Sequence, residues 1–489
     1  MNKEFNLRLV ARVMGNLVVV ESFLLLAVSI IPFLYGEHDA WYFWVSAGIS
    51  LIFAGLAFFV GRNAPSHIGK REGSVIVTFT WIIFSLFGML PFWLSGSIPN
   101  FTDAFFETIS GFTTTGASIL NNIEDLSHGM LFWRSTTHWI GGLGIIVISL
   151  AVLPLFSQSG TQLFAAETSG PTKDKIHPKI SETAKRLFAI YMILNIAETI
   201  LLRLGGMSWF DAVCQSFATI ATGGFSTKQA SIAYWHSPYI EYVIILFMIM
   251  SGVNFSLYYF SFKRKFDKVK ENEELRYFLI VLFTFTVIVA ISLLDFSKIQ
   301  TFATLEKAWR DALFTVSSLM TTCGFGTVDY MTWKPLTWII LLIVMMTGAS
   351  AGSTSGGIKM IRVVISAKAC YYEFKRLIHP NAVIPVRYNG HLVREDILTR
   401  VLVFVVLYIV VAGLGILIMA ISGVGFLESI GGTITCLGGV GPGLGLVGPA
   451  GNFHDIPDFS KWFLSLMMLA GRLELYTVFM LFTPAFWKR

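Results

Sequence analysis

Long apolar runs alternate with polar loops along the whole 489-residue chain. Ten of these runs are about as long as the 20 residues that a helix needs to cross a bilayer. The predicted membrane helices are 9–34, 40–61, 73–95, 129–156, 186–204, 238–262, 277–295, 335–366, 396–421 and 460–484. This pattern predicts a polytopic membrane protein.

A shorter and more polar segment lies between the third and fourth, fifth and sixth, seventh and eighth, and ninth and tenth predicted helices. Each copy begins with an acid, continues through a mildly apolar run and ends in a Gly-rich loop. The acid stands thirteen residues before a central glycine in the pairs Asp103–Gly116, Asp211–Gly224, Asp311–Gly324 and Glu428–Gly441. Each segment predicts a short helix that runs into a non-helical loop, with the acid at the positive N-terminal end of that helix.

The Gly-rich loops are candidates for a cation selectivity filter. Glycine adopts backbone angles closed to other residues and lets another group approach closely. Four such loops around one axis would present rings of carbonyl oxygens, which can replace the water shell of a monovalent cation. The alternative, four ordinary turns between membrane helices, does not explain the identical spacing. The candidate cation-binding residues are Thr114, Thr115, Gly116, Thr222, Gly223, Gly224, Thr322, Cys323, Gly324, Gly439, Val440 and Gly441.

The fold class follows from these repeats. We predict an all-α polytopic membrane protein with four pseudo-fourfold helix–pore-helix–helix repeats around a central pore, preceded by two extra N-terminal transmembrane helices. Non-helical backbone at membrane depth is tolerated where it lines an aqueous cavity or is buried in protein. The predicted units are 1–66 for the N-terminal helices, then the repeats 67–160, 161–265, 266–390 and 391–489.

Composition and charge support a membrane protein and indicate its orientation. The chain is 54% hydrophobic and 13% charged, whereas soluble domains carry about 25% charged residues. The loops 32–40, 96–128 and 422–457 contain no Lys or Arg, and most basic residues stand in the alternate loops. The positive-inside rule then places both termini in the cytoplasm and the four Gly-rich loops outside. The net charge of +6 therefore needs no nucleic-acid partner.

Arg472 stands inside the last predicted membrane helix. A centred arginine costs about 2.5–3.5 kcal/mol on insertion scales, so it should face water or a partner. We favour a positive barrier in the pore beneath the filter. The alternative is a structural ion pair with Glu474, Glu198 or Glu21.

Ten small residues, 348–357, interrupt the eighth predicted helix. Each glycine weakens a helix interior by about 1 kcal/mol, so we predict a flexible intramembrane gating loop. Alternatively, glycines at four-residue spacing form a small-xxx-small packing face. Lys359 either lines the same cavity or, as we favour, snorkels to the cytoplasmic edge. The candidate gate residues are Gly348, Gly352, Gly356, Gly357, Lys359 and Arg472.

The four units, their central glycines, the small-residue break and the helix with Gly471-Arg472-Leu473-Glu474 together resemble the Trk/Ktr/HKT superfamily of potassium transporters. The resemblance is greatest to the bacterial Trk-type uptake subunits, the TrkH/TrkG branch, and covers nearly the whole chain. It implies uptake of potassium and rubidium across a bacterial inner membrane, with the central glycines in the filter. Gly116 stands where sodium-preferring plant relatives carry serine, which favours potassium. The fourth loop lacks the threonine of the other three.

The resemblance also implies a homodimer with one pore per subunit and a cytosolic ring of nucleotide-binding TrkA-type regulatory subunits. Potassium would be the transported substrate. No organic cofactor is expected, because the sequence has no P-loop, no GxGxxG motif after a strand and no metal-ligand cluster. A proton- or sodium-coupled symporter of the same architecture remains the alternative. A transporter built from inverted repeats is disfavoured because the four copies run in the same direction, and an enzyme because acids and histidines are scattered.

Overall fold

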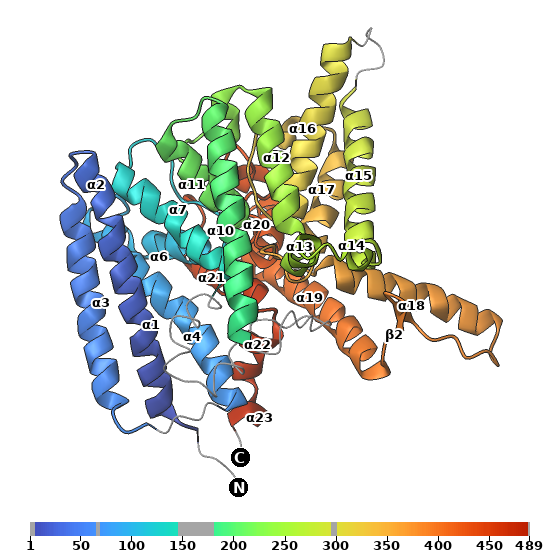
Figure 1. Ribbon diagram of the computed structural model, residues 1–489, viewed down its shortest axis with the longest axis horizontal. Coiled ribbons are helices and arrows are strands. Elements are labelled where there is room, and N and C mark those ends of the chain that lie inside the picture. The colour runs from blue at the N-terminus through green and yellow to red at the C-terminus, as the bar shows by residue number, and fades with distance from the viewer. Residues whose placement is uncertain (1–4, 65–68, 145–179, 295–300, 488–489) are drawn as a thin grey trace.

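The structure is a computed structural model that describes residues 5–64, 69–144, 180–294 and 301–487. Nearly all of its regular elements are helices, and many run side by side through the molecule (Figure 1). In these ranges six helices are long and apolar enough to cross a bilayer, and two bent pairs of helices pass the same test. The chain is therefore an all-α polytopic membrane protein, as the sequence predicts.

The two N-terminal helices lie together at one side of the molecule (Figure 1). Helix α1 (Leu7–Val28), continued by α2 (Ile30–Leu34), packs along α3 (Ala40–Val60). The packing is close because small residues face each other: a Cβ on Gly15 would lie 3.1 Å from the Cβ of Ala57. The opposite face of α3 exposes Trp41, Trp44, Ile52, Leu56 and Phe59.

The rest of the chain forms four units, called repeats 1 to 4 below. Repeat 1 contains α4 (Lys70–Gly88), α5 (Leu90–Leu94), the short helix α6 (Phe101–Phe112) and α7 (His128–Leu143). Repeat 2 contains α10 (Ile180–Leu204), the short helix α11 (Trp209–Ile220), η2 (Ser231–Trp235), α12 (Pro238–Gly252) and α13 (Phe255–Phe262). Repeat 3 contains α14 (Phe266–Lys270), α15 (Glu273–Leu293), the short helix α16 (Phe302–Met320), η3 (Tyr330–Thr332), α17 (Pro335–Thr347) and α18 (Met360–Ile378). Repeat 4 contains α19 (Glu395–Ile421), the short helix α20 (Phe426–Gly438), η4 (Gly445–Val447), α21 (Asp458–Arg472), α22 (Tyr476–Phe479), η5 (Met480–Phe482) and α23 (Pro484–Trp487).

The four repeats close into a circle. The second helix of each repeat packs against the short helix of the next one: α7 on α11, α12 on α16, α17 on α20, and α21 back on α6. The repeated acid–glycine spacing in the sequence thus corresponds to a repeated, head-to-tail contact in space, which is how a heterologous interface forms a ring.

Three of the second helices are broken, where the sequence predicts only the break in repeat 3. The predicted continuous helix 238–262 is wrong, because α12 and α13 meet at 95°. The predicted continuous helix 460–484 is also wrong, because α21 turns by 114° into α22 and η5. The predicted break in 335–366 is confirmed between α17 and α18. Of the predicted helix 129–156, the part beyond 144, like the basic loop up to 179, lies outside the described residues.

The break in repeat 2 has a visible cause in the neighbouring repeat. The N–H of Ser350 donates to the carbonyl of Gly252 at 3.0 Å, and the N–H of Phe255 donates to the carbonyl of Gly352 at 3.0 Å. The small-residue stretch of repeat 3 therefore takes up the Gly252 carbonyl and the Phe255 N–H, which a continuous helix would have bonded to the N–H of Ser256 and the carbonyl of Ser251. Asn254 begins α13 by accepting a hydrogen bond from the N–H of Ser256 at 2.8 Å.

The acids of the repeated segments stand in the first turn of three short helices, as predicted, but not of the third. Asp103, Asp211 and Glu428 occupy first turns. Helix α16 instead begins at Phe302, capped by the side chain of Thr301, so Asp311 lies well inside it.

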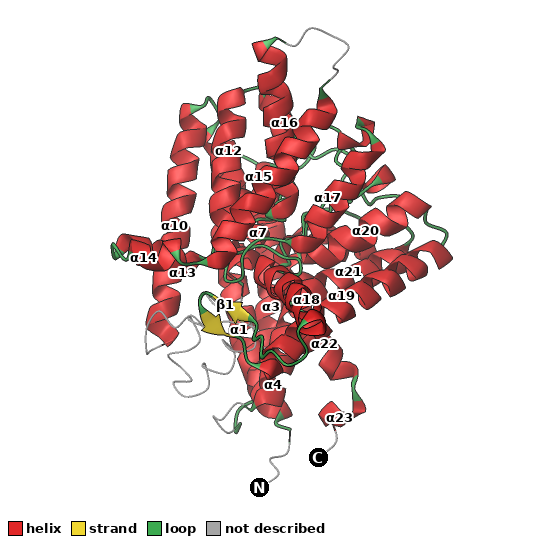
Figure 2. Ribbon diagram, turned by 90° about the vertical axis from the view of Figure 1, so that its right-hand side faces the viewer, coloured by secondary structure: helices red, strands yellow, loops and turns green. Residues whose placement is uncertain are grey.

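One hairpin departs from the all-α expectation. Strands β1 (Arg387–Tyr388) and β2 (His391–Leu392) pair antiparallel (Figure 2). Asn389 and Gly390 between them have φ of 49° and 75°, which a two-residue hairpin turn of this type requires.

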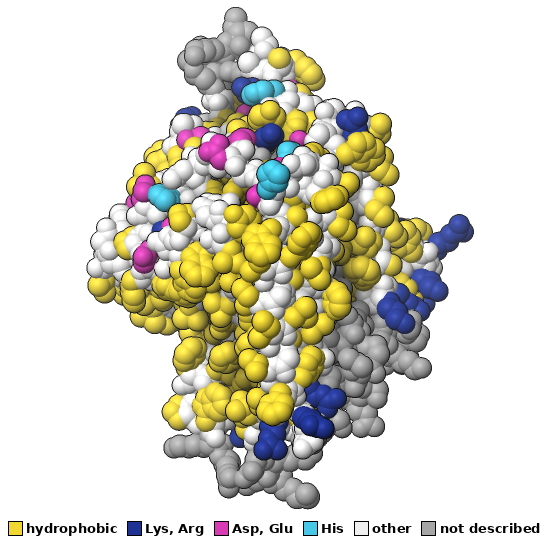
Figure 3. Space-filling model, turned by 90° about the vertical axis from the view of Figure 1, so that its left-hand side faces the viewer, with side chains coloured by type: hydrophobic (Ala, Val, Ile, Leu, Met, Phe, Trp, Pro, Cys, Tyr) yellow, Lys and Arg dark blue, Asp and Glu magenta, His cyan; other side chains and the backbone are white. Residues whose placement is uncertain are grey.

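The surface carries the pattern of a protein embedded in lipid. On the face formed by the N-terminal helices, hydrophobic side chains cover the middle of the molecule (Figure 3). Lys and Arg lie at the lower end of that face, whereas Asp, Glu and His lie toward the upper end together with further Lys or Arg side chains. Helix α1 begins and α23 ends on the lower side (Figure 1), so the basic end is also the end where the described chain starts and stops.

Candidate functional site: a ring of four backbone loops

The short helices α6, α11, α16 and α20 end in the same way. In each, the residue before the central glycine of the loop donates its N–H to the carbonyl five residues earlier, as in a Schellman C-cap. These bonds join Thr115 to Ser110 (2.9 Å), Gly223 to Ala218 (2.8 Å), Cys323 to Ser318 (2.8 Å) and Val440 to Thr435 (3.0 Å). The identical bonds give the four loops the same starting geometry.

The second residue before each central glycine has a positive φ. Thr114, Thr222 and Thr322 have φ of 54°, 55° and 57°, and Gly439 has φ of 68°. For a β-branched residue this conformation is a genuine outlier, and strained backbone of this kind clusters at functional sites. Gly439 stands where the other three loops have threonine, and it adopts the same conformation without that strain.

The central glycines interlock around the circle. A Cβ on Gly116 would overlap the carbonyl oxygen of Gly223, one on Gly224 that of Cys323, and one on Gly324 that of Val440. A Cβ on Gly441 would lie 2.8 Å from the carbonyl oxygen of Thr115, which closes the circle. We call these four glycines with the four preceding residues the ring. Its carbonyl oxygens are gathered between neighbouring loops because no side chain separates them.

The small-residue stretch of repeat 3 lies directly against the ring. The N–H of Gly356 donates to the hydroxyl of Thr322 at 2.7 Å, and a Cβ on Gly356 would overlap the carbonyl of Gly438. The hydroxyl of Thr354 donates to the carbonyl of Ile220, at the end of α11, at 3.0 Å. Residues 348–357 are not helical, so their glycines do not form one packing face of a helix. Gly348, Gly352 and Gly357 have positive φ.

Arg472 of repeat 4 contacts both the small-residue stretch of repeat 3 and the end of α7 in repeat 1. From the end of α21 its guanidinium donates to the carbonyl of Thr354 at 2.8 Å, to that of Gly142 at 3.3 Å, and to that of Gly141. Its charge therefore faces carbonyls, including those at the negative C-terminal end of α7. Glu474, one of the predicted ion-pair partners, pairs with Arg362.

Lys359 is buried and does not snorkel, so that interpretation is wrong. It is 8% exposed, has φ of 77°, and its amine donates to the carbonyl of Ser355 and, at 3.4 Å, to the hydroxyl of that residue. The amine is thus turned back into the loop because the start of α18 at Met360 is itself buried.

Sequence reasoning missed Glu274. This buried carboxylate accepts hydrogen bonds from the N–H of Ala351 at 2.6 Å and from the N–H of Ile361 at 3.1 Å. One side chain thereby ties the loop to the first turn of α18. Glu274 stands at the start of an apolar helix, where an acid is ordinary, so the local sequence gave no signal for this contact.

Above the ring, different polar contacts join the repeats at the outer ends of the loops. The hydroxyl of Tyr330 donates to the carbonyl of Gly443 at 2.6 Å between repeats 3 and 4. Burial raises the pKa of the Tyr330 phenol, so this hydroxyl stays protonated and able to donate. Between repeats 4 and 1, the amine of Lys461 binds Asp103 at 2.5 Å.

The whole chain is similar to known transport proteins. The family model TrkH, described as a cation transport protein, matches residues 44–489. The chain is 38% identical over 485 residues to the Trk system potassium uptake protein TrkH of Escherichia coli K12, covering 98% of this chain and 99% of that protein. It is 33% identical over 486 residues to the Trk system potassium uptake protein TrkG of the same strain, covering 99% of both. The crystal structure of the potassium transporter TrkH from Vibrio parahaemolyticus superposes with a TM-score of 0.88 at 33% identity, covering 99% of this chain and 100% of that one.

Proposed function

Because this chain belongs to the TrkH family of cation transport proteins, we propose that it takes up potassium, and rubidium, across the bacterial inner membrane through the ring. The observation that carries this proposal is the closed circle of four central glycines, each lying against the carbonyl of the next loop. A monovalent cation sheds its water only where oxygens replace it on every side. Backbone carbonyls from four equivalent loops meet that need.

Arg472 and the loop 348–357 act together as the gate in this proposal. The guanidinium adds positive charge on the cation's path, where the low dielectric strengthens repulsion. It is held by backbone carbonyls, one of which belongs to Thr354 of the loop itself. Movement of the loop and displacement of the arginine are therefore coupled.

The remaining parts of the proposal rest on the family. We propose a homodimer in which each subunit has its own pore, controlled by cytosolic TrkA-type subunits that bind nucleotide. The basic end of the surface in Figure 3 would then face the cytoplasm, with both termini on that side. Potassium is the transported substrate, and the family is one of transport proteins rather than of enzymes.

Rubidium-86 flux into potassium-loaded liposomes that contain the purified protein tests the proposal. We expect uptake that potassium blocks and sodium does not. In Gly116→Ser the added side chain collides with the carbonyl of Gly223, so potassium and sodium should compete more equally. In Arg472→Ala the barrier is removed, so uptake should rise.

Two results would change the conclusion. No monovalent cation flux, with or without the regulatory subunit, would contradict transport through the ring. A reversal potential that follows an imposed proton or sodium gradient, instead of the potassium gradient, would replace gradient-driven flux by coupled symport.

A further inference from the structure

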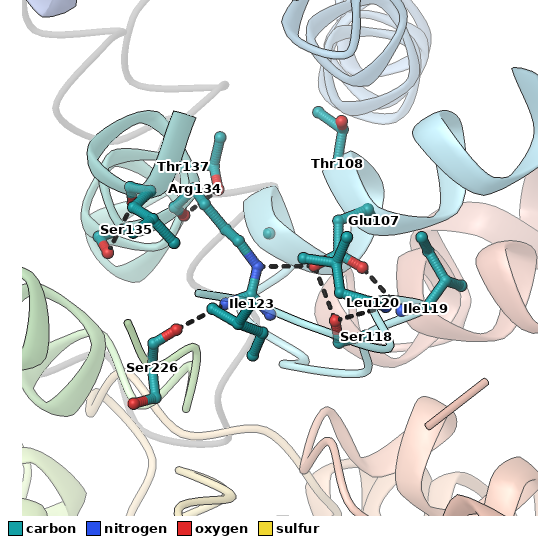
Figure 4. A network of polar contacts seen from close by, with 12 residues as sticks. Glu107, Thr108, Ser118, Ile119, Leu120, Ile123, Arg134, Ser135, Thr137 and Ser226 are labelled. Carbon is teal, nitrogen blue, oxygen red and sulfur yellow. Dashed lines mark hydrogen bonds and ion pairs between the residues drawn. The ribbon is translucent and has the colours of Figure 1, made fainter. Parts of the chain in front are cut away.

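An ionic side-chain cluster lies behind the ring at the seam between repeats 1 and 2. Arg134 of α7 points toward Glu107 of α6 (Figure 4). The Nε of Arg134 binds the Oε1 of Glu107 at 2.7 Å, and the two side chains are 3% and 1% exposed. A buried ion pair is stable only when further hydrogen bonds satisfy its remaining polar atoms, so the other partners of this pair decide what it does.

Glu107 holds the loop of repeat 1 just beyond the ring. Its carboxylate accepts the hydroxyl of Ser118 at 3.0 Å and the N–H of Ile119 at 2.9 Å. Ser118 is the second residue after Gly116. The outward continuation of the first ring loop is therefore fixed to the short helix by this carboxylate (Figure 4).

Arg134 holds the loop of repeat 2 at the corresponding place. Its Nη1 donates to the carbonyl of Ser226 at 2.9 Å, and Ser226 is the second residue after Gly224. The guanidinium carbon also lies 3.6 Å from the ring centre of Phe225, within cation–π range. One side chain thus reaches across the seam between two loops.

His138, one helical turn after Arg134, also contacts Phe225. Its imidazole stacks on the Phe225 ring, with the two ring centroids 4.0 Å apart. Its Nδ1 lies 2.7 Å from the carbonyl oxygen of Gly111. A Cβ on Gly223 would collide with this imidazole. Phe225 directly follows Gly224, so the face of α7 formed by Arg134 and His138 sets where the second ring loop lies.

From these contacts we propose that Arg134, held by Glu107, is a positioning residue that determines the selection of potassium over sodium. Selection depends on where carbonyl oxygens stand and how far they can move. Arg134 and Glu107 fix the outer ends of two neighbouring loops relative to each other. This inference rests on the proposed function, since it concerns the same ring.

The chain itself suggests the test variant. In repeat 2 the residue nine positions before the central glycine is Gln215, and its amide donates to the hydroxyl of Ser226 at 2.7 Å. Glu107 occupies the same position in repeat 1. Glu107→Gln therefore preserves a hydrogen bond to Ser118. Combined with Arg134→Leu it removes both charges together, so no buried charge is left unpaired.

Cation-dependent thermal unfolding of the purified protein is the measurement, with choline replacing potassium or sodium at constant ionic strength. We expect potassium to stabilise the wild type at lower concentration than sodium does. In Arg134→Leu/Glu107→Gln the ratio of the two half-saturating concentrations should fall about tenfold, a change of about 1.4 kcal/mol in discrimination. Rubidium flux should persist. Arg134→Lys keeps the charge but not the planar guanidinium. Its ratio of half-saturating concentrations should lie between those of the wild type and the double variant.

The control is a second ion pair that joins repeats away from the ring. Arg310 of α16 binds Glu241 of α12 at 2.7 Å, and Arg310→Leu/Glu241→Gln should keep the wild-type ratio. An unchanged ratio in the folded Arg134→Leu/Glu107→Gln protein, or an equal fall in the control, overturns the role of Arg134 while leaving the proposed function intact. A wild type that potassium stabilises no better than sodium contradicts the proposed function and this inference together.

Discussion

The ring is symmetric, whereas the layer beneath it, formed by Arg472, the loop 348–357 and their contacts, is not. At the ring, all four repeats supply the same helix ending, the same positive φ and the same close approach of a glycine to a carbonyl. In the layer beneath, each repeat supplies something different. Repeat 4 gives Arg472, repeat 3 gives the loop 348–357, repeat 2 gives the carbonyl of Ile220, and repeat 1 gives the carbonyls at the end of α7.

This difference separates selection from control in the function that we propose. A bare cation must be surrounded, so equivalent groups from every side serve it best. A barrier needs to occupy the path at one point and to leave it, so one charge and one loop are sufficient. Symmetry is therefore kept where the ion is bound and given up where its passage is regulated.

The largest expected effect breaks the symmetric layer. In Gly224→Ala the new Cβ meets the carbonyl of Cys323, at a φ of 81° that L-residues rarely adopt. Because the added Cβ displaces this carbonyl from the ring, potassium-blocked rubidium uptake should fall about tenfold to a hundredfold, which corresponds to about 1.4–2.8 kcal/mol. Liposome flux measures it.

Gly439→Ala is the matched control for that variant. Gly439 also has a positive φ, but its Cβ position has no neighbour within 4 Å, and threonine stands at this place in the other loops. Uptake should stay near the wild-type level. Equal losses in the two variants would mean that positive φ, and not the close approach, explains the effect.

A smaller effect is expected in the asymmetric layer. Glu274→Gln replaces a carboxylate that accepts from Ala351 in the loop and from Ile361 at the start of α18 by a neutral group that accepts more weakly. Hydrogen bonds to charged groups contribute about 1.5–3 kcal/mol, so the loop should be released and rubidium uptake of the isolated subunit should rise about tenfold.

Glu273→Gln is the neighbouring control for the loop. Glu273 pairs with Lys368 at a partly exposed position, where an ion pair contributes about 0–1 kcal/mol. Uptake should not change. If Glu274→Gln also leaves uptake at the wild-type level, the carboxylate does not hold the loop in its blocking position.

The smallest effect is expected at a single seam above the ring. Tyr330→Phe leaves the carbonyl of Gly443 without its buried donor, which costs about 1–3 kcal/mol of stability. Thermal unfolding should show a lower midpoint, while the preference for potassium over sodium stays the same. A changed preference would place this seam among the contacts that set the ring.

Local sequence was sufficient to predict the ring loops, because their requirements are local. Glycine at a fixed interval after an acid indicates a backbone angle that other residues rarely adopt, and that angle is a property of a single position. The same reasoning predicted the break at 348–357, where small residues cannot hold a helix.

What sequence reasoning missed depends on contacts between repeats. Nothing near Gly252 indicates that Ser350 takes its carbonyl and ends α12. Arg134 and Glu107 belong to different helices, and their partners stand in two different loops. A signal was nevertheless present. An arginine in a predicted membrane helix needs a partner, and Glu107 and Gln215 stand at matching positions before their central glycines.

The direction of contact around the ring has a consequence for how such a protein can change over generations. Each central glycine lies against the loop that follows it, in the order 1 to 2, 2 to 3, 3 to 4 and 4 to 1. A substitution in one loop is therefore compensated most directly in the adjacent loop, not in the one opposite. Among relatives, accepted replacements at Thr115, Gly223, Cys323 and Val440 should accompany replacements in the preceding loop. The four loops should therefore vary together, although they lie far apart in the sequence.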